Sequence, residues 1–267
     1  MKRAALTSLL LSLAGAAHAQ QDSLSRVLIR KNEALTLIGF GLAAAAISPA
    51  DERLARWMRS GDVQGPNARG IAGLFNFVGD PGTLVGSAGI WAFGAITHRR
   101  NVADAGLHIG ESVVSSAVIT GVLKVALGRS RPYVTADSNS HDLQFMRGRK
   151  GGQYQSLPSG HATAAFAFAA ALAAESPGKR WVAPVAYGAA TLVALARMYD
   201  DRHWASDVLL GAGIGIASGK ATVRFNHARP GNWVDRTFLP SADNGSFHLS
   251  VWRSGDGRTN VGLARGW

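Results

Sequence analysis

Six apolar stretches of helical length divide this sequence, and they limit its possible folds more than any other feature. Each stretch is rich in Ala, Gly, Leu and Val and is bounded by charged residues or helix breakers. Apolar runs of more than about 10 residues are longer than most buried strands and indicate helices. The sequence therefore predicts one mostly helical domain, with helices in residues 34–50, 81–98, 112–123, 162–174, 182–196 and 208–219.

The lengths of these runs bear on whether the helices cross a membrane. Three of the six contain only 12 or 13 residues, below the roughly 18 expected of a spanning helix. The mean hydropathy of the chain is also only +0.06. Both values favour a soluble or peripheral bundle. The alternative is an integral membrane protein, since residues 81–98 carry no formal charge and residues 34–50 nearly reach spanning length.

The N-terminus has the three parts of a secretory signal peptide. Lys2 and Arg3 form a basic region, residues 4–17 are apolar, and residues 17–19 read Ala-His-Ala, a small-x-small cleavage site. We therefore expect residues 1–19 to be removed and the mature chain to be exported, in the periplasm. A retained membrane anchor is the alternative interpretation.

The absence of cysteine and the excess of basic residues narrow the classes of function. The sequence contains no cysteine, which excludes thiol chemistry, disulfides and Cys-ligated zinc. The formal net charge of +11 favours anionic partners such as phosphate esters or anionic lipids. The sequence has no Lys/Arg-rich run interleaved with aromatic residues, so we expect no nucleic-acid partner.

Two segments break the helical pattern. Residues 132–158 are polar with little apolar periodicity, and they predict a long loop that is either a binding element or a disordered insertion. In residues 241–267, apolar and polar side chains alternate on both sides of an Asp-Gly turn, which predicts a small C-terminal β-hairpin. The domain plan is thus a helical domain at 20–240 followed by a short tail.

Three short segments place charged or polar groups at the ends of apolar helices. In the first, Lys124 and Arg131 are seven residues apart, close to two helical turns, so their cations can converge. In the second, Ser159 is a natural N-cap, and Gly160 lets a ligand approach the backbone. His161 follows at the positive end of the helix dipole. By itself each segment also fits an ordinary helix end, but together they suit a bound anion.

The third segment holds Arg197, His203 and Asp207. His203 and Asp207 are four residues apart, one helical turn, so the carboxylate can accept the Nδ1 proton and leave Nε2 free as a nucleophile. A metal site built from His203, Asp207 and His161 is the alternative interpretation. The nearby Lys and Arg side chains would repel a cation, which makes an oxyanion the better ligand.

Together the three segments resemble the signatures of the type 2 phosphatidic acid phosphatase and vanadium haloperoxidase superfamily: Lys-x6-Arg-Pro, Pro-Ser-Gly-His and Ser-Arg-x5-His-x3-Asp. They run from Lys124 to Asp207 in the family's order. One position departs from the signatures, because Ala196 takes the place of the serine before Arg197. The resemblance implies an all-α fold, a bundle of about six core helices with the site between helix ends.

The resemblance also implies a role for each site residue. His203 would attack phosphorus, Asp207 would orient the imidazole, and His161 would protonate the leaving group and then activate water. The phosphoryl oxygens would be bound by the other members of the signatures: Lys124, Arg131, Ser159, Gly160 and Arg197. No metal or other cofactor is implied, because three cationic side chains take the place of Mg²⁺, and vanadate could bind as a phosphate mimic.

The sequence thus predicts a helical phosphatase domain at 20–240 that hydrolyses a phosphate monoester, of a lipid or of a small soluble molecule, through a phosphohistidine. Two alternatives remain. One is a vanadate-dependent haloperoxidase, in which the equivalent of His203 ligates vanadium. The other is a non-catalytic anion-binding protein associated with the membrane. Haloperoxidases of this superfamily are usually much longer, so the compact chain favours the phosphatase.

Overall fold

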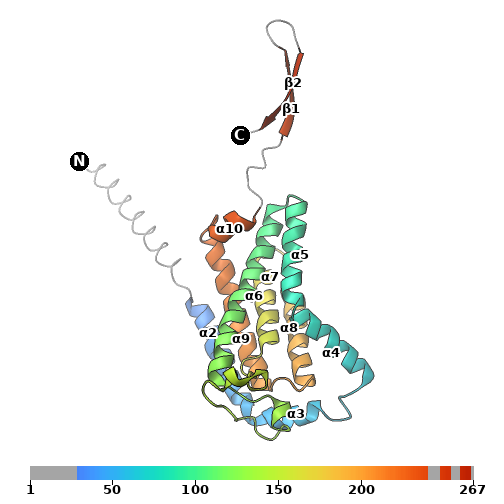
Figure 1. Cartoon of the computed structure of the whole chain (residues 1–267), viewed down its shortest axis with the longest axis vertical. Helices are drawn as coiled ribbons and strands as arrows, with labels where there is room; N and C mark the ends of the chain where they lie inside the picture. Colours follow the sequence, from blue (N-terminus) through green and yellow to red (C-terminus); the bar gives the residue numbers. More distant parts are fainter. Residues whose placement is uncertain (1–28, 240–246, 254–258, 266–267) are drawn as a thin grey trace, which may run out of the picture.

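The computed structural model describes residues 29–239, 247–253 and 259–265 (Figure 1). The predicted signal peptide lies outside these residues. The helices, in chain order, are α2 (Lys31–Ile47), α3 (Asp51–Met58), α4 (Pro66–Gly79), α5 (Gly82–Ile96), α6 (Arg100–Leu127), α7 (Gly160–Ala174), α8 (Val182–Tyr199), α9 (Ala205–His227) and α10 (Trp233–Phe238). All six apolar stretches are confirmed as helices, in α2 and α5 to α9, and so is the all-α bundle.

Helix α7 is the core of the bundle and packs against α6, α8 and α9 (Figure 1). Three glycines of α9 lie one turn apart on the face toward α7: Gly211, Gly215 and Gly219. A Cβ atom at these positions would lie 2.7, 2.4 and 2.6 Å from backbone oxygens of residues 159, 163 and 167. A methyl group does not fit at such distances, so the glycines permit the close approach of the two helices. This packing brings the starts of α7 and α9 together.

The apolar runs do not predict α3 and α4, which lie at the lower end of the bundle in Figure 1. Helix α3 carries four charged residues among its eight, and α4 mixes Asn, Arg and Gly with its apolar residues. Neither segment therefore contains a long apolar run, although both form helices once their apolar faces pack on the bundle. Both helices matter for the site, because α3 contributes Asp51 and α4 contributes Asn76.

The predicted loop at 132–158 is confirmed, and it is folded. It contains three short 3-10 turns, η2 (Pro132–Val134), η3 (Arg147–Lys150) and η4 (Gly152–Tyr154). Arg147 holds the loop against the end of α6. Its guanidinium donates twice to the backbone oxygen of Gly128, at 3.0 and 2.9 Å, and twice to Asp142, at 2.9 Å to Oδ1 and at 2.7 Å to the backbone oxygen. The loop is therefore a structured part of the site end of the molecule.

The C-terminal segment for which the sequence predicts a hairpin contains two strands, β1 (Phe247–Arg253) and β2 (Thr259–Arg265). They pair antiparallel, with residue 251 opposite residue 261. The predicted turn between them lies outside the described residues.

Apolar side chains on the outside of the bundle bear on its location. Within the described residues, four helical segments are long and apolar enough to cross a membrane: Lys31–Met58, Arg100–Leu127, Val182–Tyr199 and Ala205–His227. Large hydrophobic side chains are exposed on α2, α6 and α8, among them Leu35, Ile38, Leu42, Val114, Val118, Val122, Val185, Leu192 and Leu195. Burying such surfaces in water-free surroundings is favourable. The structure therefore favours the alternative, an integral membrane protein, over the soluble or peripheral bundle.

The apolar runs in the sequence understate these lengths for a physical reason. Helix α6 extends over 28 residues, although its uninterrupted apolar run covers only 112–123. The polar residues that precede the run, such as His108 and Glu111, have partners on neighbouring elements, Glu175 for His108 and Asn226 for Glu111. A single buried polar residue thus ends an apolar run without ending a helix.

Candidate active site

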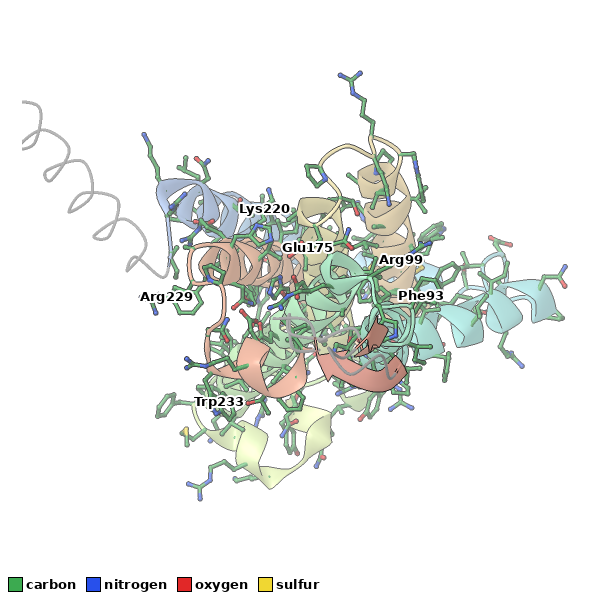
Figure 2. All side chains as sticks on the ribbon, turned by 90° about the horizontal axis from the view of Figure 1, so that it is seen from above. Phe93, Arg99, Glu175, Lys220, Arg229 and Trp233 are labelled. Carbon is green, nitrogen blue, oxygen red and sulfur yellow. The ribbon has the colours of Figure 1, made fainter. Side chains whose placement is uncertain are left out.

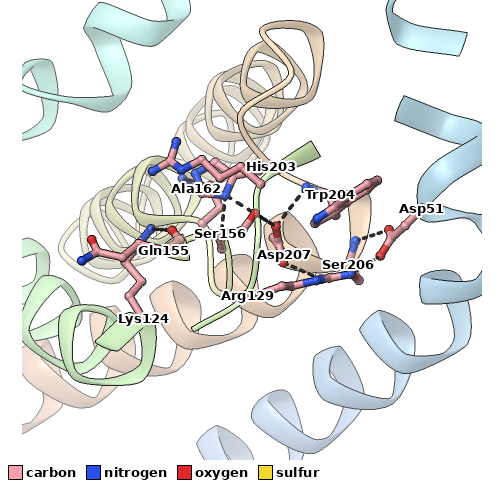
Figure 3. Close-up of polar contacts among 12 residues, drawn as sticks. Asp51, Lys124, Arg129, Gln155, Ser156, Ala162, His203, Trp204, Ser206 and Asp207 are labelled. Carbon is pink, nitrogen blue, oxygen red and sulfur yellow. Dashed lines mark hydrogen bonds and ion pairs between the residues drawn. The ribbon is translucent and has the colours of Figure 1, made fainter. Parts of the chain in front are cut away.

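The three motif segments meet at one end of the bundle, where α6 ends and α7 and α9 begin (Figures 1 and 3). The backbone N–H of Ser159 donates to the backbone oxygen of Asp207 at 3.0 Å and joins the start of α7 to the start of α9. A Cβ atom at Gly160 would lie 3.5 Å from Cε of Lys124, so the last turn of α6 lies beside the first turn of α7. Three segments far apart in the sequence therefore form one site.

His203 lies between α8 and α9 and is only 3% exposed. Its Nδ1 lies 2.8 Å from the backbone oxygen of Ser156 (Figure 3). Because a carbonyl oxygen can only accept a hydrogen bond, Nδ1 carries the proton, and Nε2 keeps its lone pair. The predicted acceptor, Asp207, is nearby, but its Oδ2 lies 3.6 Å from Nδ1. The backbone of Ser156 is thus the direct acceptor of the Nδ1 proton.

Other donors occupy the carboxylate of Asp207. Oδ2 accepts the backbone N–H of Trp204 at 2.9 Å and the hydroxyl of Ser156. Oδ1 accepts Nη1 of Arg129 at 2.6 Å (Figure 3). Asp207 therefore holds Ser156 and the segment around His203 in place, so it acts on the imidazole through Ser156 as well as through its charge.

Arg129 is a site residue that the motif analysis missed. It is 3% exposed, and its guanidinium bridges two buried carboxylates, with Nη1 on Asp207 and Nη2 on Asp51 at 2.8 Å. The guanidinium also lies 5.6 Å from the centre of the Trp204 ring. Arg129 lies inside the first motif, which could have marked it as a site residue. The spacing of the motif alone does not show that Arg129 faces a carboxylate and Arg131 faces the anion. Asp51 carried no signal, because only the fold brings α3 to this site.

The surroundings of His203 keep its imidazole neutral. Burial, together with the positive charges of Lys124 and Arg131, lowers the pKa of His203 to about 3. Asp207 opposes this shift. At neutral pH the imidazole is therefore uncharged, which is the form that a nucleophile requires.

The first motif supplies two cations, both held by the loop at 132–158. Nζ of Lys124 donates to the backbone oxygen of Gln155 at 2.7 Å, and Nε of Arg131 donates to that of Gly152 at 2.9 Å. Each cation keeps further donors beyond these bonds, because an ammonium has three N–H groups and a guanidinium has five. The loop thus orients both side chains and leaves donors available for an anion.

Arg197, on α8, is the third cation and is 9% exposed. Its Nη1 donates to Oδ1 of Asn76 at 2.6 Å, and Oδ2 of Asp200 lies 3.7 Å from the same nitrogen. Among the described residues, Nε of Arg197 has no hydrogen-bond partner, although it is buried. Two aspartates follow Arg197 in the sequence, and only Asp200 lies beside it. The other, Asp201, pairs with Arg59, whose Nη1 lies 3.3 Å from Oδ2 of Asp201. No signal in the sequence pointed to Asn76.

The second motif forms the first turn of α7. Ser159 is fully buried and is the N-cap, with its hydroxyl accepting the backbone N–H of Ala162 at 3.5 Å. His161 follows in the same turn, and a Cβ atom at Gly79 would lie 3.2 Å from its Cδ2. Burial and the positive charges of Arg197, Lys124 and Arg131 lower the pKa of the His161 imidazole to about 4. Both histidines therefore lie beside the same cationic cluster.

The position that departs from the signature, Ala196, is 4% exposed on α8. Its methyl group cannot supply the hydrogen bond that a serine hydroxyl would make. Arg197 nevertheless has Asn76 and Asp200 beside it, so its orientation does not depend on residue 196.

Fold and site together define an all-α bundle that gathers cations and two histidines where helix ends meet. Residues 105–230 match the PAP2 superfamily, so this segment of the chain is similar to members of that superfamily. Every predicted site residue, from Lys124 to Asp207, lies inside the matched segment.

Individual relatives support the same assignment. A lipid A 1-phosphatase from Porphyromonas gingivalis is 34% identical over 113 residues, which are 42% of this chain and 21% of the relative. A lipid A 1-phosphatase from Rhizobium etli is 34% identical over 111 residues, 41% of this chain and 45% of the relative. The chain thus spans less than half the length of these relatives.

A solved structure shows the shared fold. The transmembrane PAP2 type phosphatidylglycerolphosphate phosphatase from Bacillus subtilis superimposes with a TM-score of 0.56 and 23% sequence identity. The match covers 74% of this chain and 97% of the bacillus chain. At this identity the likeness concerns the arrangement of the helices.

Proposed function

We propose that this chain is a membrane-embedded phosphatase that hydrolyses lipid phosphate monoesters through a phosphohistidine at His203. One observation carries the proposal. Nδ1 of His203 is committed to the backbone oxygen of Ser156, which leaves Nε2 as an unprotonated nucleophile in the cationic cluster of Lys124, Arg131 and Arg197. A neutral imidazole beside fixed cations suits attack on an anionic phosphoryl group.

In the first step, Nε2 of His203 attacks phosphorus in line with the departing lipid alkoxide. The N–P bond forms and the P–O bond to the lipid breaks. His161 takes up a proton when the anionic phosphate binds among the cations, and it gives this proton to the leaving oxygen. Lys124, Arg131 and Arg197 bind the phosphoryl oxygens together with the Ser159 hydroxyl and the Gly160 amide. Their positive charge stabilises the negative charge that develops in the transition state, so the step as proposed requires no metal ion.

In the second step, His161 takes a proton from water, and the resulting hydroxide attacks phosphorus. The N–P bond breaks, inorganic phosphate leaves, and His203 returns to its neutral form with the proton on Nδ1. Asp207 acts as a positioning residue in both steps, because it holds the Ser156 segment and its charge stabilises the imidazolium-like phosphohistidine.

The substrate class rests on two supports. The curated relatives are lipid A 1-phosphatases, and the outer surface of the bundle suits a lipid bilayer. We therefore infer that the substrate is a phosphate monoester on a lipid, with the 1-phosphate of lipid A as the first candidate. The basic and then apolar N-terminus leads us to propose that the catalytic end faces the periplasm.

The proposal is tested with the full chain purified in detergent. Release of inorganic phosphate is measured from lipid A, from phosphatidylglycerolphosphate and from a soluble chromogenic ester. We expect release from a lipid to exceed release from the soluble ester, and His203→Ala to remove it. The matched control is His141→Ala, since His141 is an exposed histidine outside the three motifs. Full turnover by His203→Ala would refute the nucleophile, and turnover of the soluble ester alone would refute the lipid substrate.

The orientation in the membrane needs a separate experiment. Intact cells that express the chain are given a phosphate ester that does not cross membranes. Hydrolysis by intact cells is expected if the catalytic end faces the periplasm. Hydrolysis only after the cells are lysed would place the site on the cytoplasmic side.

A further inference from the structure

A second cluster of ionisable side chains lies at the other end of the bundle, near α10 (Figure 1). Figure 2 looks down on this end, where Glu175 lies among the helices. His108 comes from α6, Glu175 is the C-cap of α7, and His227 is the last residue of α9. His108 is sixteen residues from Lys124 on α6, which at 1.5 Å per residue is about 24 Å. The phosphatase mechanism uses none of these residues.

The three side chains point their ligand atoms at one another. Nδ1 of His108 lies 2.7 Å from Oε1 of Glu175, and Nε2 of His227 lies 3.1 and 3.2 Å from the two Glu175 oxygens. One atom from each residue falls in a group whose members all lie within 4.8 Å of one another. A tetrahedral Zn²⁺ ion with bonds of about 2.0–2.2 Å holds neighbouring N and O ligands roughly 3.3–3.5 Å apart. The cluster therefore has the spacing of such a site after small side-chain adjustments.

Asp235, on α10, provides an independent sign of a missing ligand. Its side chain is 5% exposed, and its Oδ1 has no hydrogen-bond partner among the described residues. This oxygen lies 3.8 Å from Nε2 of His108, on the side of the ring opposite Nδ1. Histidines that bind a metal through one ring nitrogen commonly donate the other N–H to a carboxylate, which fixes the tautomer. Asp235 lies where such a carboxylate would be.

The charge around the cluster suits a cation. Three carboxylates, Asp104, Glu175 and Asp235, line a cavity of about 370 Å³ together with His108 and His227, and Arg100 is the one arginine that also lines it. The cavity gives a fourth ligand, such as water, room beside the two histidines and Glu175. The mixed nitrogen and oxygen ligands suit Zn²⁺ or a similar transition-metal ion better than Mg²⁺ or Ca²⁺, which favour oxygen alone.

We propose that His108, Glu175 and His227 form a binding site for a transition-metal dication of the Zn²⁺ type, with Asp235 orienting His108. The site ties together the ends of α6, α7 and α9, so an ion bound there links three helices of the bundle. It is separate from the proposed catalytic site and does not depend on the phosphatase assignment.

The test uses the full chain in detergent, without a histidine tag and after removal of metals with a chelator. Retained Zn²⁺ is measured by equilibrium dialysis and metal analysis, and Co²⁺ is used as a spectroscopic probe of the ligands. We expect one Zn²⁺ per chain and a visible Co²⁺ absorption band of the kind given by four-coordinate sites. Added Zn²⁺ should displace the Co²⁺ and should raise the unfolding temperature.

The variants separate a metal site from a network of ion pairs. His227→Ala is expected to weaken Zn²⁺ binding by more than about 100-fold, because it removes a direct ligand, and Asp235→Asn by about 10–100-fold, because it removes the orienting carboxylate. His227 is largely exposed, with 55% of its side chain accessible, so its removal should leave the fold intact. His141→Ala, at the other end of the bundle, should bind Zn²⁺ like the wild type.

Two outcomes overturn the proposal. In the first, the wild-type chain retains no Zn²⁺ and gives no Co²⁺ band, which makes the cluster an ion-pair network. In the second, His227→Ala binds as tightly as the wild type, which places the ion elsewhere. A loss of phosphatase activity in His203→Ala bears on neither outcome, so the two proposals can fail independently.

Discussion

The two ends of the bundle are built on the same three helices but carry opposite charge. At the end where α7 and α9 begin, Lys124, Arg131 and Arg197 converge, and Nε of Arg197 is a buried donor without an acceptor among the described residues. At the other end carboxylates converge, and Oδ1 of Asp235 is a buried acceptor for which the described part of the chain supplies no hydrogen-bond donor. Unpaired buried groups are costly, so each indicates a ligand of the opposite kind. One helical frame can therefore present an anion site and a cation site about 24 Å apart.

The largest expected effect separates the two ends. His203→Ala should lower phosphate release by at least about a thousandfold, because the nucleophile is lost, while Zn²⁺ binding stays at the wild-type level. His227→Ala should weaken Zn²⁺ binding, while phosphate release stays at the wild-type level. The measurements are phosphate release and metal retention on the same preparations. A variant that lowers both equally would show that the ends are coupled or that the bundle has lost its fold.

The next effect concerns the buried network of Arg129 with Asp51 and Asp207 at the site end. Arg129→Ala should lower the free energy of unfolding by about 3–5 kcal/mol, because Asp51 and Asp207 would be left as buried carboxylates without their shared cation. Denaturant or thermal unfolding in detergent measures the loss. Arg149→Ala is the matched control, since Arg149 is an exposed arginine of the loop. A loss of less than about 1 kcal/mol would mean that water or another cation replaces the guanidinium.

A smaller effect, on vanadate inhibition, is expected when Arg197 is replaced by lysine, which keeps the positive charge but not the planar guanidinium. Arg197→Lys removes the planar guanidinium that Asn76 orients, and we expect the inhibition constant of vanadate to rise by about tenfold. Inhibition of phosphate release by vanadate measures this change. Arg180→Lys, at an exposed arginine, should not alter vanadate inhibition. Unchanged inhibition in Arg197→Lys would indicate that the charge alone matters at this position.

The smallest expected effect is the response of stability to pH. Burial lowers the pKa of His203 to about 3, whereas an unfolded histidine titrates near 6.5. Between these values the unfolded chain binds the additional proton, so stability is retained above about pH 6.5 and is lost as the pH falls. The unfolding temperature should therefore fall between pH 7 and pH 5, and it should fall less in His203→Gln. His141→Gln should follow the wild type, and an equal fall in His203→Gln would contradict the buried neutral histidine.

The apolar runs predicted the helices better than they predicted the location of the protein. Runs such as 162–174 are apolar because they are buried on all sides, and this property is visible in the sequence. Whether exposed residues such as Val118 face water or lipid depends on which face of α6 packs inward. The length of an apolar run does not show which face of its helix is exposed. The run lengths therefore favoured a soluble bundle, whereas the exposed apolar faces favour an integral membrane protein.

The motifs indicated that residues far apart in the sequence would lie together, but they did not predict the supporting contacts. Lys124, His161 and His203 come together as their spacing and the family resemblance suggested, because motif residues lie at fixed positions on helix ends. The acceptor for His203 was expected to be Asp207, yet it is the backbone of Ser156. Backbone atoms have no sequence signature, so this contact could not be predicted.

By itself, the sequence determined the positions of the main helices, the order of the three motifs and the excess of positive charge, since each depends on residue type and spacing along one segment. Only the tertiary structure decided that Arg129 bridges Asp51 and Asp207, that Asn76 holds Arg197, and that two histidines meet Glu175 at the far end. These contacts join residues 52 to 121 positions apart. The packing of helices across the bundle, including the close approach at Gly215, therefore determines which side chains meet.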